Sequence, residues 1–128
     1  MARAHVEILL DSVILIDHLN GISPATEYLR EVASRAAVSV ISRAEVLAGY
    51  DEQDTSSAKQ LLDFYTTLGI DSGIVDAAAS LRHHHGWKLP DAFQAAIAVS
   101  HGLRLATRNT RDFPPDRFPF VIVPYRLR

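Results

Sequence analysis

Four carboxylates that are far apart in this chain lie at predicted strand ends or in the first turns of predicted helices. Asp11 directly follows an apolar run over residues 6–10, which predicts a buried strand. Glu45 lies one turn into a helix after a second predicted strand, Asp91 lies in the first turn of another helix, and Asp112 follows a further strand by one loop. Because ligands of open α/β sheets bind outside the carboxyl ends of the strands, we expect these side chains to converge at one sheet edge.

Such a cluster of carboxylates suits a hard divalent cation. Bare carboxylates a few ångströms apart repel one another, so some of them would remain protonated. Mg²⁺ or Mn²⁺ removes this conflict, because both ions prefer oxygen ligands and keep bound water available for chemistry. A cation held in this way activates water and stabilises charge on the attacking and leaving oxygens, which is the chemistry of phosphodiester hydrolysis.

Each acid also has a structural explanation, and the local pattern alone leaves both interpretations open. Asp11 can cap the helix that follows it, and Glu45 completes a Ser-x-x-Glu capping box with Ser42. Asp91 complements a helix dipole, and Asp112 is placed as a turn residue before a Phe-Pro pair. The joint placement of the four acids at strand ends is what favours a functional site.

Apolar runs and helical periodicity alternate along the chain. Strands are predicted over residues 6–10, 37–41, 68–70, 103–106 and 120–123. Helices are predicted over residues 13–19 and 90–100, and as starting at residues 23, 42, 54 and 71 or 72. This alternation predicts one domain over residues 1–128, an α/β sandwich with a mostly parallel sheet.

Composition excludes several classes of protein. The 128 residues include no cysteine, which excludes a disulfide scaffold, a Cys-based zinc site and thiol catalysis. The sequence has no apolar run long enough for a membrane span and no signal-peptide pattern, so we expect a soluble cytoplasmic protein without a membrane partner. The formal net charge is −2, yet the C-terminal part is rich in arginine. This part is either a rim that faces phosphates, a basic surface for an acidic protein partner or simply a solvated basic tail.

Several polar and aromatic side chains have two interpretations. The histidines at 83–85 point in different directions on a helix, so a solvated helix end is favoured over a metal site, and RNA contact is the lesser alternative. Trp87 either stacks on a base or packs at the rim of the core. Thr107 and Asn109 either hold a metal-bound water or hydrogen-bond the loop that carries Asp112.

Four segments resemble, in order and spacing, the four motifs of PIN-domain nucleases, and specifically of VapC-type toxins. They are residues 9–17, 39–49, 89–98 and 105–113, and together they cover nearly the whole chain. The first segment has the pattern of an apolar strand, Asp11, a hydroxyl residue and an apolar helix. Some relatives carry the fourth carboxylate at the position of Asn109 and others at that of Asp112, and here only Asp112 supplies charge.

The resemblance implies a three-layer α/β/α sandwich with a parallel sheet. It implies a Mg²⁺- or Mn²⁺-dependent endoribonuclease toxin that cleaves structured RNA, such as tRNA or rRNA, and inhibits translation. A cognate VapB-type antitoxin would neutralise it, and homodimers and hetero-oligomers with the antitoxin are expected.

The motifs assign roles to particular residues. The catalytic and metal-binding set is Asp11, Glu45, Asp91 and Asp112. The supporting set is Ser12, Thr107 and Asn109. Arg108 and Arg111 are expected either to contact backbone phosphates of RNA or to form surface ion pairs.

Two other function classes are compared with this one. A phospho-acceptor receiver domain would need paired acids after the first strand and a lysine near the last strand, and the two lysines, Lys59 and Lys88, are badly placed for that. A non-catalytic PIN-like module that binds RNA or protein is the main alternative, and the intact acidic set argues against it.

Overall fold

The computed structural model describes residues 5–127, and in that part of the chain five parallel strands form one sheet in the order β3-β2-β1-β4-β5. The strands are β1 (Ile8–Leu10), β2 (Ala36–Ser39), β3 (Thr66–Leu68), β4 (Arg104–Ala106) and β5 (Val121–Ile122). β1 is central, since it pairs with β2 on one side and with β4 on the other. Its three residues are all buried, as expected for a strand covered on both faces.

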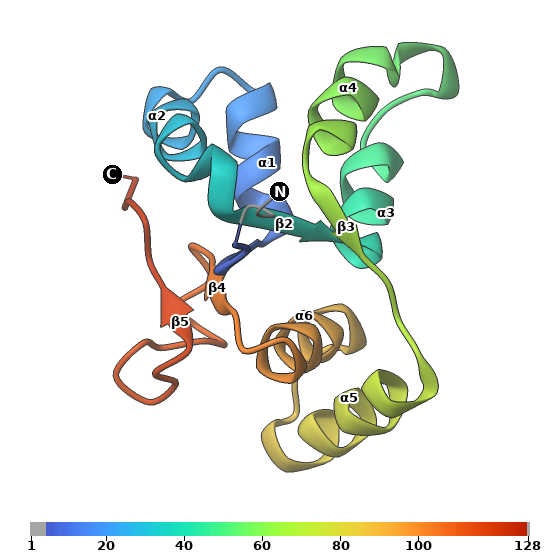
Figure 1. Cartoon of the computed structure of the whole chain (residues 1–128), viewed down its shortest axis with the longest axis vertical. Coiled ribbons are helices and arrows are strands. Elements are labelled where there is room, and N and C mark those ends of the chain that lie inside the picture. Colours follow the sequence, from blue (N-terminus) through green and yellow to red (C-terminus); the bar gives the residue numbers. More distant parts are fainter. Residues whose placement is uncertain (1–4, 128) are drawn as a thin grey trace.

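Helices cover both faces of this sheet (Figure 1). One layer contains α1 (Ser12–Leu19), α2 (Ser23–Val32), α3 (Val40–Ala48) and α4 (Ser56–Phe64). The other layer contains α5 (Ser72–His85) and α6 (Leu89–Ser100). The prediction of a three-layer α/β/α sandwich with a parallel sheet is confirmed.

The two layers enclose separate apolar clusters, one on each face of the sheet. Successive side chains of a strand point to opposite faces. Accordingly, Ile8 and Leu10 belong to the cluster beneath α1, α2 and α4, whereas Leu9 belongs to the cluster beneath α5 and α6. The short apolar run of β1 therefore anchors both halves of the core.

The structure corrects the predicted junction between β2 and α3. The predicted strand over residues 37–41 ends at Ser39, and α3 begins at Val40 instead of Ser42. Ser39 is the N-cap, since its hydroxyl accepts a hydrogen bond from the Ser42 N–H at 3.0 Å. Ser42 therefore lies inside the helix, and the predicted capping box between Ser42 and Glu45 is wrong.

Two further boundaries differ from the predictions. Asp54 does not cap α4 but ends a short 3₁₀ helix (Glu52–Asp54), and β3 lies two residues before the predicted strand. By contrast, α5 begins where expected, since Asp71, one of the two predicted start residues, is the N-cap and accepts a hydrogen bond from the Ile74 N–H. Within the described range, the helices are too short or too polar to cross a bilayer.

Candidate active site at the carboxyl edge of the sheet

The four predicted acids come from four separate segments around one edge of the sheet. Asp11 is the N-cap of α1, immediately after β1, and Glu45 lies in α3, the helix that follows β2. Asp91 lies in the first turn of α6, and Asp112 lies in the loop between β4 and β5. The charges of Asp11, Glu45 and Asp112 all raise the pKa of Asp91, so each of these three acids lies within electrostatic range of Asp91.

Burial and mutual repulsion disfavour ionisation in this cluster. Burial is the main cause that raises the pKa of Asp91 to about 6, the three neighbouring carboxylates add to it, and Lys88 opposes it. Burial also raises the pKa of Glu45, with a smaller contribution from the charge of Asp11 and an opposing hydrogen bond from Ser12. A divalent cation among these oxygens would relieve both effects.

Asp11 is the most strongly held of the four acids. Its Oδ1 accepts hydrogen bonds from the Ser12 N–H at 2.9 Å and from Gln94 Nε2 at 3.2 Å. Its Oδ2 accepts a hydrogen bond from the Thr107 hydroxyl at 2.6 Å. Burial nevertheless raises the pKa of Asp11, although all three hydrogen bonds favour the charged form. The capping role of Asp11 is therefore compatible with its predicted role in the site.

The loop after β4 is braced by Thr107 and Asn109. Thr107 Oγ1 accepts a hydrogen bond from the Asn109 N–H at 3.0 Å. The Asn109 amide donates from Nδ2 to Asp112 Oδ2 at 3.0 Å, and its Oδ1 accepts the Asp112 N–H at 3.2 Å. The structure shows the loop hydrogen bonds of one interpretation, in which Asn109 holds Asp112 in place. The interpretation that these residues hold a metal-bound water stays a prediction.

Trp87 fixes the same loop from the other side. Its ring is buried and packs against Phe113 and Phe118, and its Nε1 donates to the carbonyl oxygen of Asp112 at 3.0 Å. The ring of His85 stacks on it at a centroid distance of 4.4 Å. The packing interpretation of Trp87 is therefore favoured over base stacking, because neither ring face is open to a nucleotide.

The histidine run occupies the exposed last turn of α5, as the helix-end interpretation predicts. His84 lies with its Nδ1 2.8 Å from the carbonyl oxygen of Ser80, one turn earlier. Across residues 5–127, no three histidine, aspartate or glutamate side chains stand ready-made as a set of metal ligands.

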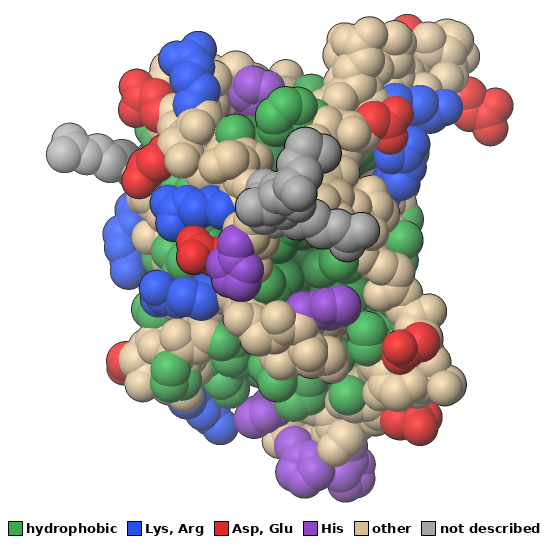
Figure 2. All heavy atoms as spheres, viewed as in Figure 1, with side chains coloured by type: hydrophobic (Ala, Val, Ile, Leu, Met, Phe, Trp, Pro, Cys, Tyr) green, Lys and Arg blue, Asp and Glu red, His purple; other side chains and the backbone are tan. Residues whose placement is uncertain are grey.

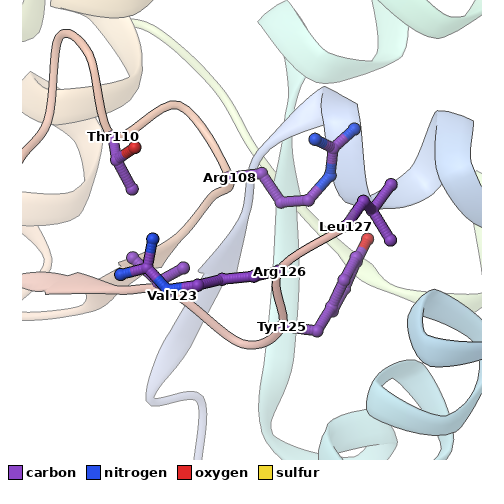
Figure 3. Close-up of a pocket in the computed structure, with 6 residues that line it drawn as sticks. All are labelled: Arg108, Thr110, Val123, Tyr125, Arg126 and Leu127. Carbon is purple, nitrogen blue, oxygen red and sulfur yellow. The ribbon is translucent and has the colours of Figure 1, made fainter.

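Arg108 forms an ion pair. Its Nε and Nη2 donate to the two carboxylate oxygens of Asp17 at 2.6 and 3.0 Å, and the Tyr125 hydroxyl donates to Asp17 Oδ2 at 2.8 Å. Burial disfavours the charge of Asp17, but the hydrogen bonds and the positive charge outweigh it and lower the pKa of Asp17. Arg108 and Tyr125 also line a small pocket with Thr110, Val123, Arg126 and Leu127 (Figure 3).

Arg111 is exposed and makes no ion pair among the described residues. On the face that Figure 2 shows, most of the lysine and arginine side chains lie on the side of the molecule where α2 and β5 lie, with acidic side chains among them. The side of this face over α2 and β5 therefore carries mixed charge.

Sequence reasoning missed one buried polar group next to the acids, the side chain of Gln94. Gln94 is 1% exposed and contacts Asp11, Ser39 and Ser42. The available signal was its position, since Gln94 interrupts an apolar helix three residues after Asp91 and so shares a face with it.

Comparisons with known proteins agree with this architecture. The family model described as PIN domain matches residues 8–115. Ribonuclease VapC10 of Mycobacterium tuberculosis is 33% identical over an alignment of 133 residues, which covers 94% of this chain and 98% of that protein. Ribonuclease VapC19 of the same organism is 30% identical over 125 residues, which span 91% and 98%.

Solved structures give the same result. A chain of a toxin-antitoxin complex from Klebsiella pneumoniae superposes with a TM-score of 0.86 at 33% identity, over 94% of this chain and 100% of that one. A chain of DNA-bound VapBC from Salmonella typhimurium shares the fold, with a TM-score of 0.75 at 20% identity over 91% and 95% of the two chains. The chain therefore belongs to the PIN-domain family and, within it, to the VapC-type ribonuclease toxins of toxin–antitoxin systems.

Proposed function

We propose that this protein is a Mg²⁺- or Mn²⁺-dependent endoribonuclease that cleaves structured RNA, such as tRNA or rRNA, and so inhibits translation. The observation that carries this proposal is the placement of four acids from separate segments around the carboxyl edge of the sheet, where burial and the charges of the other three carboxylates raise the pKa of Asp91 to about 6. A site that concentrates four acids without basic partners of equal number is suited to a hard cation. Membership of the VapC-type ribonucleases supports RNA as the substrate.

Some of the site residues would bind the cation, and others hold those ligands in position. Asp11, Asp91 and Asp112 would bind the cation directly or through water, and Glu45 would act as a further ligand or as the base that orients the attacking water. When bound, the cation supplies a more acidic water and stabilises charge on the attacking and leaving oxygens.

The supporting side chains keep these acids in place. Thr107 and the Ser12 N–H hold Asp11, and Asn109 holds Asp112. Such outer contacts orient metal ligands, and their loss weakens metal affinity or activity by about 10- to 100-fold in known sites.

Two partners belong to this proposal. RNA phosphates would meet Arg111 more readily than Arg108, because the guanidinium of Arg108 is already engaged by Asp17. A VapB-type antitoxin would neutralise the enzyme, as supported by the similarity to a chain of a toxin-antitoxin complex at 33% identity. We propose further that the protein forms homodimers, and hetero-oligomers with the antitoxin.

The test compares purified wild type with Asp11→Asn and Asp91→Asn on total RNA, in Mg²⁺ and in EDTA. Each variant should lose cleavage by about 100-fold or more while circular dichroism stays unchanged, because an amide supplies no charge to a cation. Asp76→Asn, an exposed acid on α5, is the matched control and should cleave like wild type.

Wild type and Asp11→Asn should also differ in their effect on growing cells. Induction of wild type in a bacterial host should arrest growth and give discrete new RNA ends, and Asp11→Asn should do neither. Cleavage by Asp11→Asn would refute the site. Folded wild type that cuts no RNA with either cation would support the non-catalytic binding module instead.

A further inference from the structure

The side chain of Gln94 links three of the segments that carry the proposed metal ligands. From α6, its Nε2 donates to Asp11 Oδ1 at 3.2 Å and to the Ser42 hydroxyl oxygen of α3 at 2.6 Å. Its Oε1 accepts a hydrogen bond from the Ser39 hydroxyl at 2.6 Å, at the end of β2. One buried amide thus joins the β1–α1 corner, the β2–α3 corner and α6.

The direction of these hydrogen bonds is fixed by their partners. The Ser42 hydroxyl donates to the Leu10 carbonyl at 3.2 Å, so its oxygen is free to accept from Gln94. The Ser39 oxygen accepts the Ser42 N–H, so its own proton is free for Gln94 Oε1. Since an ionised Asp11 can only accept, the amide nitrogen of Gln94 must face Asp11. Both protons and the oxygen of the amide are then used.

Helical spacing connects this amide to the two remaining acids. Asp91 precedes Gln94 by three residues on α6, and Glu45 follows Ser42 by three residues on α3. Residues three apart lie on the same face of a helix. The Gln94–Ser42 hydrogen bond therefore joins the helix faces that carry Asp91 and Glu45.

The contacts of Asp11 limit how it can bind a cation. Each carboxylate oxygen offers two lone pairs. Oδ1 uses both, to the Ser12 N–H and to Gln94, whereas Oδ2 uses one, to Thr107. One lone pair remains, and it lies on Oδ2.

We propose that Gln94 is a positioning residue that sets the spacing of Asp11, Glu45 and Asp91 and directs Asp11 to bind a cation through Oδ2. This inference rests on the proposed metal site. Its consequence is that Gln94 controls the affinity of the site for the cation, although Gln94 itself touches neither cation nor RNA.

The experiment titrates Mn²⁺ alone into the full-length protein by calorimetry, without RNA. Gln94→Met keeps the length of the side chain and removes its donors, and Gln94→Asn keeps the amide on a stem too short to reach Asp11. Both variants should bind Mn²⁺ about 10- to 100-fold more weakly. Cleavage assays on a fixed RNA should show a lower kcat at saturating RNA with KM for RNA changed by less than about twofold.

Ile97→Val is the matched control. Ile97 is fully buried one turn further along α6 and packs in the apolar cluster, without a polar contact to the acids. This variant loosens the same helix and should keep the Mn²⁺ affinity of wild type. Should a Gln94 variant fail to fold, Ser42→Ala removes the α3 partner of Gln94 and should weaken Mn²⁺ binding in the same direction.

The outcomes separate the two claims. Wild type that binds no Mn²⁺ would overturn the proposed metal site itself. Wild type that binds Mn²⁺, together with folded Gln94 variants of unchanged affinity, would overturn the positioning role and leave the site standing. An equal loss of affinity in Ile97→Val would also overturn it, because general loosening of α6 would then explain the effect.

Discussion

Asp11 and Asp91 belong to one cluster but differ in their burial, their hydrogen bonds and the charges around them. Asp11 is buried and accepts three hydrogen bonds, two of them from side chains 83 and 96 residues away in sequence. Asp91 is partly buried, and three neighbouring carboxylates add to the effect of burial on its pKa. Both carboxylates are therefore costly to keep ionised in the folded protein without a cation, which is why the proposed site calls for one.

The raised pKa of Asp91 predicts a specific dependence of stability on pH. Its pKa is about 6 in the folded protein and about 4 in the unfolded chain, so the free energy of unfolding should fall as pH rises between these values and stay lower above pH 6. Asp91→Asn should therefore stabilise the metal-free protein at pH 8, by about 1 to 2 kcal/mol after allowance for partial exposure, and hardly at all at pH 4.

Urea denaturation in EDTA at the two pH values measures this effect. Asp76→Asn, which removes an exposed carboxylate, should change the free energy of unfolding little at either pH. Equal stabilisation by Asp91→Asn at pH 4 and pH 8 would show that the effect is not electrostatic.

The placement of the four acids around one edge of the sheet was predictable from sequence, whereas the contacts of the amide beside them were not. Strand-end placement marks Asp11 and Asp112 even without a structure, because parallel strands deliver their carboxyl ends to one edge. The role of Gln94 depends on Ser39, 55 residues earlier, and no local pattern reports such a contact. The capping-box pattern at Ser42 misled because Ser39, one turn earlier, competes for the same helix start and takes it.

Asp17 connects elements that are distant in the chain. From α1 it binds Arg108 of the loop after β4 and Tyr125 of the C-terminal segment. These contacts span 91 and 108 residues. The Asp17 cluster, made of Asp17, Arg108 and Tyr125, therefore connects the C-terminal segment to α1, the helix that Asp11 caps.

Asp17→Asn should destabilise the protein by about 1 to 3 kcal/mol at pH 7, since it breaks a partly buried, bidentate charged hydrogen bond. Because the pKa of Asp17 is lowered on folding, this stabilisation is present above about pH 4 and is lost as pH falls through the folded pKa. Chemical denaturation at pH 7 and at low pH checks both parts.

Asp63→Asn on α4 is the comparison. It breaks the Arg43–Asp63 ion pair, whose carboxylate side chain is 67% exposed, against 10% for that of Asp17. An exposed pair contributes about 0 to 1 kcal/mol, so the two variants should differ clearly. Equal effects would mean that the Asp17 cluster adds no more than an ordinary surface pair.

The alternation of strands and helices determines the three-layer architecture of the molecule, and the sequence predicted this architecture. Element boundaries were less predictable: residues 40 and 41 have strand-forming side chains, yet they continue as helix because the buried Ser39 caps α3. The strand β3 was predicted over residues 68–70, two residues too late, because its exposed threonines lack the apolar pattern of a buried strand.

Metal removal should be visible in the stability of the entire protein. A ligand that binds only the folded state stabilises it by about 2.7 kcal/mol at 100 times its Kd. Saturating Mg²⁺ or Mn²⁺ should thus raise the Tm of wild type above its value in EDTA, and Asp11→Asn should show no such rise. Emission of Trp87, the single tryptophan, reports the transition, because its ring is buried beside the Asp112 loop. An equal rise in both proteins would place cation binding elsewhere.

The central position of β1 has a consequence for synthesis on the ribosome. β1 is made first of the strands, but its neighbour β4 and the Thr107 hydroxyl that holds Asp11 are translated about one hundred residues later. Contacts of such separation form late, since the intervening chain must be present before its ends can meet. A nascent chain should therefore carry no complete acidic site until the loop of Asp112 has left the exit tunnel. The ribosome that makes this protein would therefore not be exposed to an active nuclease during its synthesis.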